Sequence, residues 1–248
     1  MSNQVVLVTG ALTGIGRATA FAFARDGAHL VVSGRRDESG QALAGELKAL
    51  GVFAESVRAD VRHDDEVRDL VDQVVARFGR LDVAVNNAGT EGKPGPLTEQ
   101  TAETYAATFD TNVLGTVLSL KHEMRVMQAQ GRGSIINLSS VVGHKAFPGA
   151  SVYVASKHAV EGLTKAAALE GAPFGVRVNA VAPGPIQTEM LDRFTGDAAG
   201  KAGLIGIIPL KRAGTPDEVA RIIVFLGSDQ ASYLTGQIVS VDGGASAG

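Results

Sequence analysis

The strongest constraint on the fold is a regular alternation of short apolar runs with longer helical patterns along the whole chain. Runs of this kind are typical of parallel strands buried on both faces, with helices as the crossover connections. The expected strands are residues 4–9, 30–33, 53–57, 81–85, 134–138, 176–181 and 237–241. We therefore predict an α/β protein with a single doubly wound Rossmann-type domain: a seven-stranded, mainly parallel sheet with helices on both faces.

The helical patterns between these runs follow the same scheme. We expect helices at residues 17–25, 38–50, 64–78, 98–130, from Tyr153 to 171, and 217–226. The stretch 192–210 is rich in glycine and alanine, so we predict an irregular, mobile lid there rather than a strand. No linker or internal repeat divides the chain. The expectation is one domain over residues 1–248, with a substrate lid at about 185–210.

Composition excludes several classes of function. The chain has 248 residues, a formal charge of −3 and no basic run, so no nucleic-acid partner is expected. It has no cysteine, which excludes disulfides, thiolate metal sites and a cysteine nucleophile. Its five histidines lack the spacing of a zinc site, and no G-x-S-x-G elbow is present, so we expect neither a metal nor a serine hydrolase.

The first residues contain no basic segment followed by a long apolar stretch, so we expect no signal peptide. No apolar run approaches the ~20 residues that a membrane-spanning helix needs. The default prediction is a cytoplasmic protein without a membrane partner.

A glycine-rich turn, Thr9-Gly10-Ala11-Leu12-Thr13-Gly14-Ile15-Gly16, links the first strand to the first helix. In this arrangement the free N–H groups and positive dipole end of a helix N-terminus can receive a phosphate. Glycine also permits close backbone approach and positive φ. The alternative is a tight strand-to-helix connection without a ligand.

The second strand ends in Gly34-Arg35-Arg36, with no acidic residue before Asp37. In dinucleotide folds an acidic residue here binds the ribose 2′-hydroxyl, whereas an arginine accommodates a 2′-phosphate. The two arginines favour NADP. Solvated surface arginines are the alternative, and an arginine stacked on adenine would keep NAD possible.

Polar residues recur where other strands end. Asp60 follows the third strand, where it could bind an adenine amino group or cap the next helix. Asn86-Asn87-Ala88-Gly89 follows the fourth and suits either close approach to a ligand or a plain turn. Ser140 follows the fifth. Asn112 lies within an expected helix, where it could cap, bend the helix, bind water or be a tolerated polar residue.

Tyr153 and Lys157 are four residues apart, so on a helix their side chains share one face. A free tyrosine titrates near ~10, and a nearby lysine cation would lower that value towards neutral pH. The pair predicts a proton donor and acceptor for general acid–base catalysis. The alternative is a packed tyrosine beside a solvated lysine.

Taken together and in this order, these pieces resemble a classical short-chain dehydrogenase/reductase over essentially the whole chain. They are the T-G-x-x-x-G-I-G turn, Asp60, N-N-A-G, Asn112, Ser140, Y-x-x-x-K, the Pro183-Gly184 turn and V-D-G-G. The resemblance implies that Tyr153 exchanges a proton with the substrate oxygen, to which Ser140 hydrogen-bonds. It implies that Lys157 binds the nicotinamide ribose and lowers the pKa of Tyr153. Asn112 would hold a water that passes protons onward from Lys157.

The resemblance also implies a cofactor site. Gly10, Gly14 and Gly16 would form the pyrophosphate turn, and adenine, ribose or carboxamide would contact Asp60, Val61, Asn87, Ile186 and Thr188. The other implied cofactor residues are Thr13, Ile15, Arg35, Arg36, Ala88, Gly89, Tyr153, Lys157, Pro183 and Gly184. NADP-preferring relatives often have Ser then Arg or Lys where this chain has Leu12 and Thr13. The NADP prediction therefore rests on Arg35 and Arg36.

The segments expected to contact substrate, 140–151 and 185–210, contain few charges. This favours an apolar or neutral ketone or alcohol as the small-molecule substrate: 3-oxoacyl thioesters, cyclic or aryl ketones, steroids and sugars are candidates. The alternatives are a catalytically silent dinucleotide sensor or scaffold, and dehydration or epimerisation with the same cofactor. Net consumption of reduced cofactor would distinguish them. The resemblance also implies a homo-oligomer, commonly a tetramer.

Overall fold

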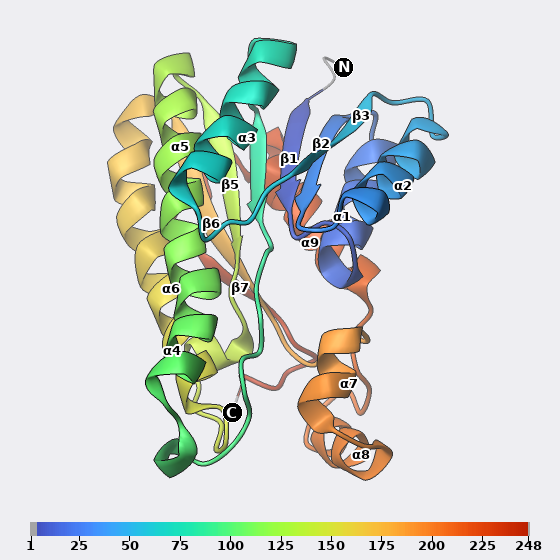
Figure 1. Cartoon of the computed structure of the whole chain (residues 1–248), viewed down its shortest axis with the longest axis vertical. Coiled ribbons are helices and arrows are strands. Elements are labelled where there is room, and N and C mark those ends of the chain that lie inside the picture. The colour runs from blue at the N-terminus through green and yellow to red at the C-terminus, as the bar shows by residue number, and fades with distance from the viewer. Residues whose placement is uncertain (1–3, 248) are drawn as a thin grey trace.

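A computed structural model describes residues 4–247 and contains one seven-stranded, wholly parallel sheet (Figure 1). The strands are β1 (Val5–Thr9), β2 (His29–Gly34), β3 (Ala54–Arg58), β4 (Val83–Asn86), β5 (Gly133–Leu138), β6 (Val176–Pro183) and β7 (Ile238–Val241). Their order is β3-β2-β1-β4-β5-β6-β7. The predicted doubly wound sheet is confirmed, and each expected strand lies within a few residues of its predicted place.

Helices cover both faces of the sheet. They are α1 (Gly14–Arg25), α2 (Asp37–Lys48), α3 (Asp64–Phe78), α4 (Ala102–Phe109), α5 (Gly115–Gln130), α6 (Ser151–Gly171), α7 (Glu189–Thr195), α8 (Ala198–Gly206) and α9 (Pro216–Gly227). Figure 1 shows α3, α5 and α6 on one face and α1, α2 and α9 on the other. Within the described part of the chain no helix has the length and apolar character to cross a membrane.

The strict alternation of side chains along β1 explains why its sequence is apolar throughout. Val5 and Leu7 pack in the core beneath α3, α5 and α6, whereas Val6 and Val8 pack in the core beneath α1, α2 and α9. All four are at most 2% exposed. Burial of each such side chain contributes roughly 1.5–3 kcal/mol, so a polar residue at any of these positions would be costly.

The order of the strands reverses beside β1. The chain passes outward from β1 to β2 and β3, then returns to β4 on the other side of β1. Open α/β sheets bind ligands outside the carboxyl ends of the strands at such a switch point. Thr9 and Asn86 are paired there at the ends of β1 and β4, so the glycine turn and the N-N-A-G stretch start side by side.

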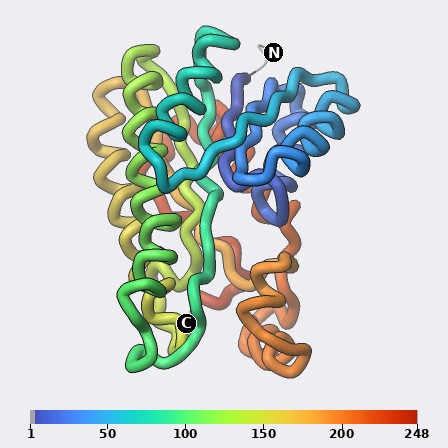
Figure 2. The backbone as a smooth tube through the Cα atoms, in the orientation of Figure 1, coloured from blue at the N-terminus to red at the C-terminus, as the bar shows by residue number. Residues whose placement is uncertain are grey.

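The sequence predicted an irregular segment at residues 192–210, and this prediction is wrong. The segment contains most of α7 and all of α8. Each helix has a side-chain cap: Thr188 accepts a hydrogen bond from the Leu191 amide, and Asp197 accepts one from the Gly200 amide. These caps stabilise helices that the glycine content disfavours. Figure 2 shows this segment, in orange, at the lower right, opposite the green chain after β4, which descends at the lower left.

The expected helix over 98–130 is divided into parts. A 3-10 turn covers Leu97–Glu99, and α4 then begins with a capping box between Thr101 and Thr104. Between α4 and α5 the backbone forms a π-helical turn, Asp110–Leu114, which contains Asn112. Among the alternatives left open for Asn112, its place in this turn agrees with an irregularity of the helix. Residues 1–3 and 248 of the predicted domain lie outside the described residues.

Candidate functional site

The glycine turn after β1 requires glycine for two physical reasons. Gly10 and Gly14 have φ angles of 61° and 54°, in the left-handed region that other residues rarely adopt. A Cβ on Gly16 would lie 2.4 Å from both Asn87 Nδ2 and the Gly10 carbonyl oxygen. Asn87 Nδ2 donates a hydrogen bond to that carbonyl at 2.8 Å, which ties the N-N-A-G stretch to the turn.

The N-terminus of α1 is open to an anion. Its N-cap residue, Thr13, makes no side-chain capping bond, and no acidic side chain lies in the first turn. The first amide N–H groups of a helix have no partner within the helix, and the dipole places positive charge there. Together with the close-approach glycines, this turn fits the pyrophosphate of a dinucleotide. Ile15, in the same turn, lines the large cavity described below.

The predicted adenine end lies beyond β2 and β3. Arg35 and Arg36 are exposed there, and neither side chain has a hydrogen bond or ion pair within residues 4–247. Asp60 is buried and forms a two-pronged ion pair with Arg62, which holds the pKa of the carboxyl at about 2. The Arg35 charge contributes to that lowering, so the two side chains are close. Val61 packs against Gly115, where a Cβ would collide with the Val61 side chain.

The opposite wall of the cofactor site follows β6. Gly184 donates its amide to the Val241 carbonyl, and Ile186 forms an isolated bridge with Gly214. Thr188 caps α7, and its Cγ2 would lie 3.1 Å from a Cβ on Gly14. The predicted residues after β6 and those of the glycine turn therefore face each other.

Tyr153 and Ser140 meet at the carboxyl edge of the sheet. Tyr153 lies in the first turn of α6, and Ser140 follows β5. The Ser140 side chain accepts a hydrogen bond from the Val142 amide, and its hydroxyl group lowers the pKa of the Tyr153 phenol. Both hydroxyl groups line one cavity, so one oxygen atom of a ligand could contact both.

Lys157 lies one helical turn after Tyr153, as the spacing predicts. Its ammonium group is buried, donates to the Leu138 carbonyl oxygen at 2.8 Å and lies 5.7 Å from the centre of the Tyr153 ring. Asn112 lies nearby, because a Cβ on Gly89 would be 3.3 Å from Asn112 Oδ1 and 3.6 Å from Lys157 Nζ. Gly89 therefore allows these two side chains to approach the same point.

The π-helical turn directs Asn112 into the protein. Its Oδ1 accepts a hydrogen bond from the Thr90 amide, and its Nδ2 donates to the Thr90 carbonyl and to Ser156 Oγ. Ser156 Oγ in turn donates to the Tyr153 carbonyl at 2.7 Å. Asn112 thereby connects the chain after β4 to the helix that carries Tyr153. Its predicted role in holding a water stays a prediction.

The expected lowering of the Tyr153 pKa is wrong for this arrangement. Burial raises the pKa of Tyr153 to about 12, the nearby Ser140 hydroxyl opposes this rise, and the charge of Glu91 adds to it. Burial also lowers the pKa of Lys157 to about 8. Spacing alone indicated that the two groups are neighbours, whereas the cost of burying a charged form dominates both pKa values.

The cavity that joins these groups has a volume of about 380 Å³. Its wall is largely apolar and comes from the turn after Ser140, the segment after β6 and the helices α7 and α8. Phe147 and Phe194 contribute rings from opposite sides, with centroids 5.7 Å apart. A mostly apolar cleft with a few convergent polar groups is typical of a small-molecule site.

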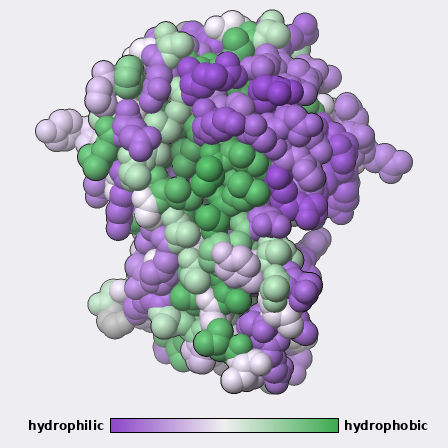
Figure 3. Space-filling view, turned by 60° about the vertical axis from the view of Figure 1, so that its left-hand side comes forward, coloured by the Kyte–Doolittle hydropathy of each residue, from purple (hydrophilic) through white to green (hydrophobic). Residues whose placement is uncertain are grey.

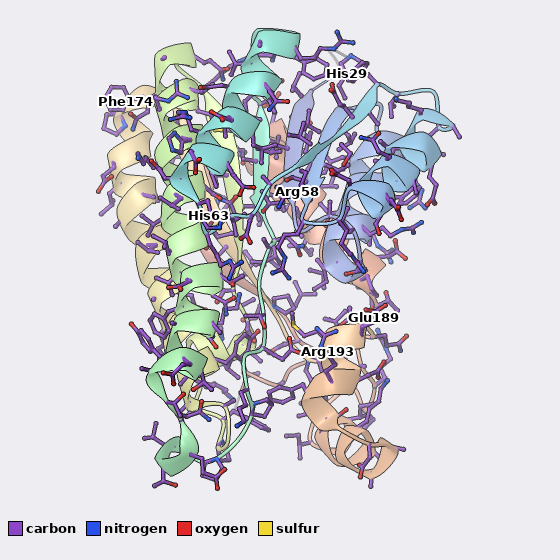
Figure 4. The ribbon with its side chains drawn as sticks, in the orientation of Figure 1. His29, Arg58, His63, Phe174, Glu189 and Arg193 are labelled. Atoms are coloured by element: carbon purple, nitrogen blue, oxygen red, sulfur yellow. The ribbon has the colours of Figure 1, made fainter. Side chains whose placement is uncertain are left out.

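Sequence reasoning missed two polar groups of this site. Glu91 lines the cavity and pairs with Arg193 on α7, where Figure 4 labels Arg193 near Glu189. Glu161 lies behind the Ser140 turn and binds His144 and Ser139. Glu91 directly follows Gly89-Thr90, and this position next to the N-N-A-G stretch could have indicated from sequence that Glu91 belongs to the site. Nothing in the spacing of Glu161 and His144 indicated their contact.

Comparison with known proteins agrees with this geometry. The family model described as "Enoyl-(Acyl carrier protein) reductase" matches residues 10–246. The 3-oxoacyl-[acyl-carrier-protein] reductase FabG of Staphylococcus epidermidis is 41% identical, and the match covers 98% of each chain. The two solved structures described next share the fold of this chain.

Two similar solved structures contain different nicotinamide cofactors. One is titled "ElxO with NADP Bound", with a TM-score of 0.91, 35% identity, and coverage of 99% of this chain and 100% of the other. The other is an NAD⁺-bound xylitol dehydrogenase, with a TM-score of 0.94, 33% identity, and coverage of 97% and 98%. The chain thus belongs to the classical short-chain dehydrogenase/reductase family, whose members are NAD(P)-dependent oxidoreductases that act on CH–OH groups.

Proposed function

We propose that this protein interconverts a neutral ketone and its secondary alcohol, with NADP as the preferred cofactor and Tyr153 as the general acid and base. The observation that carries the proposal is that the Tyr153 and Ser140 hydroxyl groups line the same largely apolar cavity, together with Lys157. The relatives named above act on substrates as different as an acyl thioester and a polyol, so their names do not identify the ketone.

A nicotinamide dinucleotide bound at the glycine turn would supply the hydride for reduction of the carbonyl carbon. Ser140 and Tyr153 would both hydrogen-bond the carbonyl oxygen, and Tyr153 would transfer its phenolic proton to that oxygen as negative charge develops there. Removing one such donor typically raises the barrier by roughly 3–4 kcal/mol. The Lys157 cation, held by the Leu138 carbonyl, would stabilise the resulting phenolate. In oxidation the same proton moves in the opposite direction.

Tyr153→Phe tests this assignment, because it removes the proton and leaves the ring. We expect kcat for ketone reduction to fall about 10²–10⁴-fold, the usual contribution of a general acid. Affinity for NADPH, measured by fluorescence titration, should change little. A variant that retains most of its activity would contradict the role of Tyr153. A wild-type protein that binds NADPH but consumes none with any ketone of a broad panel would favour the sensor alternative.

The NADP preference is supported by the position of Arg35 and Arg36 after β2, exposed and without an ion-pair partner in the described chain. An arginine at this point can accommodate a 2′-phosphate. We expect NADPH to bind about tenfold more tightly than NADH, a difference of about 1.4 kcal/mol, and Arg35→Ala to remove the difference. Arg68→Ala, an exposed arginine on α3 paired with Asp69, is the control. Equal binding of both nucleotides would leave the catalytic proposal intact and overturn the NADP preference.

A homo-oligomer is the second part of the proposal. Figure 3 shows hydrophobic surface gathered in the middle of the face turned forward from the left side of Figure 1, where α5 and α6 lie. Leu114 and Val117, beside and within α5, and Leu169 on α6 are exposed large apolar side chains, with Leu169 78% exposed. Covering such a surface would stabilise an assembly. Light scattering on wild type and on Val117→Glu tests it. Cytoplasmic location stays a prediction.

A further inference from the structure

The substrate cavity has a largely apolar wall that contains one carboxylate and two lysines. Within residues 4–247, Glu91 is the only acidic side chain that lines it, and its side chain is 9% exposed. The lysines of the wall are already engaged: Lys157 Nζ donates to the Leu138 carbonyl, and Lys145 Nζ donates to the Ala245 carbonyl. A buried carboxylate in such a wall needs a specific partner.

That partner comes from the far side of the cavity. Arg193 Nε lies 2.6 Å from Glu91 Oε1, and Arg193 Nη2 lies 3.3 Å from Oε2, so the pairing uses both oxygens. Arg193 belongs to α7, 102 residues further along the chain, and its side chain is 58% exposed. The ion pair therefore connects the chain after β4 to α7, the two segments that stand opposite each other in Figure 1.

The charge of Glu91 reaches the reacting end of the cavity. It is the charged group that raises the pKa of Tyr153, in addition to burial. Charges interact more strongly through the protein interior than through water. A ligand in contact with Tyr153 would feel the same charge.

We propose that Glu91 is a specificity-determining residue, which with Arg193 makes the cavity select neutral ketones and alcohols and reject those that carry a carboxylate or phosphate. This inference rests on the proposed function and names its substrate class. An anionic substituent would have to lie beside a buried carboxylate of the same charge. The arginine beside it already donates to Glu91 through Nε and Nη2.

A polar but uncharged substituent would be treated differently. A substrate hydroxyl group remote from the reacting carbon can donate a hydrogen bond to Glu91, because an ionised carboxylate is a strong hydrogen-bond acceptor. The expected substrates are thus neutral molecules, with or without a second hydroxyl group.

The test compares a matched pair of ketones, methyl 4-oxocyclohexanecarboxylate and the free 4-oxocyclohexanecarboxylate, with NADPH as reductant. They differ in one charge. For wild type we expect kcat/KM for the ester to exceed that for the acid about a hundredfold. Glu91→Gln should reduce this ratio at least about tenfold, mainly by raising kcat/KM for the acid, because it removes the repulsion and frees Arg193. Glu91→Asp keeps the charge and should keep most of the ratio.

Asp192→Asn is the matched control, because it removes a carboxylate from the same helix as Arg193 but outside this cavity. Asp192 pairs with Lys201 and is exposed, so the ester-to-acid ratio should not change. Thermal melting and NADPH titration on each variant confirm folding and cofactor binding.

The outcomes separate the two proposals. An unchanged ratio in Glu91→Gln, or an equal loss of activity with both ketones, would overturn the selective role of Glu91 and leave ketone reduction standing. Equal kcat/KM for ester and acid in wild type would do the same. Failure of wild type to reduce either ketone, or any other of a broad panel, would overturn the proposed function, and this inference with it.

Discussion

Glu123 carries an ionisable group in the centre of the protein, behind the candidate site. It lies on α5, is 1% exposed, and accepts a hydrogen bond from Asn86 Nδ2 at 2.9 Å. Asn86 Nδ2 also donates to Asn137 Oδ1, so the amide bridges two strands and the helix. Burial raises the pKa of Glu123 from 4.5 to about 7, and the Asn86 hydrogen bond only partly opposes this.

This pKa makes stability depend on pH in a defined direction. Between about pH 4.5 and 7 the folded protein keeps the Glu123 proton, whereas the unfolded chain has lost it. The unfolding free energy therefore falls as pH rises through this window, and above it the whole cost of the buried charge is present. Each pKa unit is worth 1.36 kcal/mol, so the decline attributable to Glu123 is about 3 kcal/mol.

Glu123→Gln removes the titrating group and keeps an acceptor for Asn86. The measurement is urea unfolding of wild type and variant at matched protein concentration from about pH 4.5 to 8.5. The free energy of the variant minus that of wild type should increase by about 3 kcal/mol across this range. Glu170→Gln, an exposed position on α6, should give a difference within about 0.5 kcal/mol that does not vary with pH. Parallel curves for wild type and Glu123→Gln would refute the reasoning.

Four further predictions follow from single contacts. Gly16→Ala places a Cβ 2.4 Å from the Gly10 carbonyl oxygen and should weaken NADPH binding at least about tenfold, as measured by titration. Gly45→Ala, at a position on α2 with open space around it, should instead stabilise the folded protein by up to about 1 kcal/mol, as measured by thermal melting. Glu161→Gln should lower the unfolding free energy by about 1–3 kcal/mol and reduce kcat without changing the Kd for NADPH, because the carboxylate braces only the turn that carries Ser140. Thr215→Ala removes the capping box of α9 and should cost about 1 kcal/mol in thermal unfolding, and Thr215→Ser should restore it. Because the pKa of Tyr153 is about 12, alcohol oxidation should accelerate steadily from about pH 7 to 10, while ketone reduction should not need that rise; pH profiles that coincide would contradict this.

The parts of the fold that could be predicted from sequence are those in which a local residue pattern is typical of a single local structure. A short, almost wholly apolar run such as β1 is typical of a strand buried on both faces, and the glycines after it fit a turn with positive φ. The prediction for residues 192–210 was wrong because their glycines disfavour helices, whereas side-chain caps at Thr188 and Asp197 stabilise the two helices that form there. Those caps were visible in the sequence as Thr and Asp before short apolar stretches.

The candidate site followed less completely. Their four-residue spacing on α6 correctly indicated that Tyr153 and Lys157 are neighbours. The pKa of each group depends on how much water surrounds it, and residue spacing carries no information about that. The pairing of Glu91 with Arg193 joins residues 102 positions apart through the tertiary fold, so no local pattern could predict it.

The π-helical turn at Asp110–Leu114 has a consequence for how the chain tolerates length changes. A wide turn of this kind accommodates one residue more than an α-helix would, and each residue rotates a helix by about 100°. Deleting one residue here would let α4 and α5 merge into a single regular helix. It would also turn the faces of the merged helix relative to each other by about a quarter of a revolution. Asn112 and the buried face of α5 could then no longer both point inward, so the segment should tolerate substitutions far better than single-residue deletions.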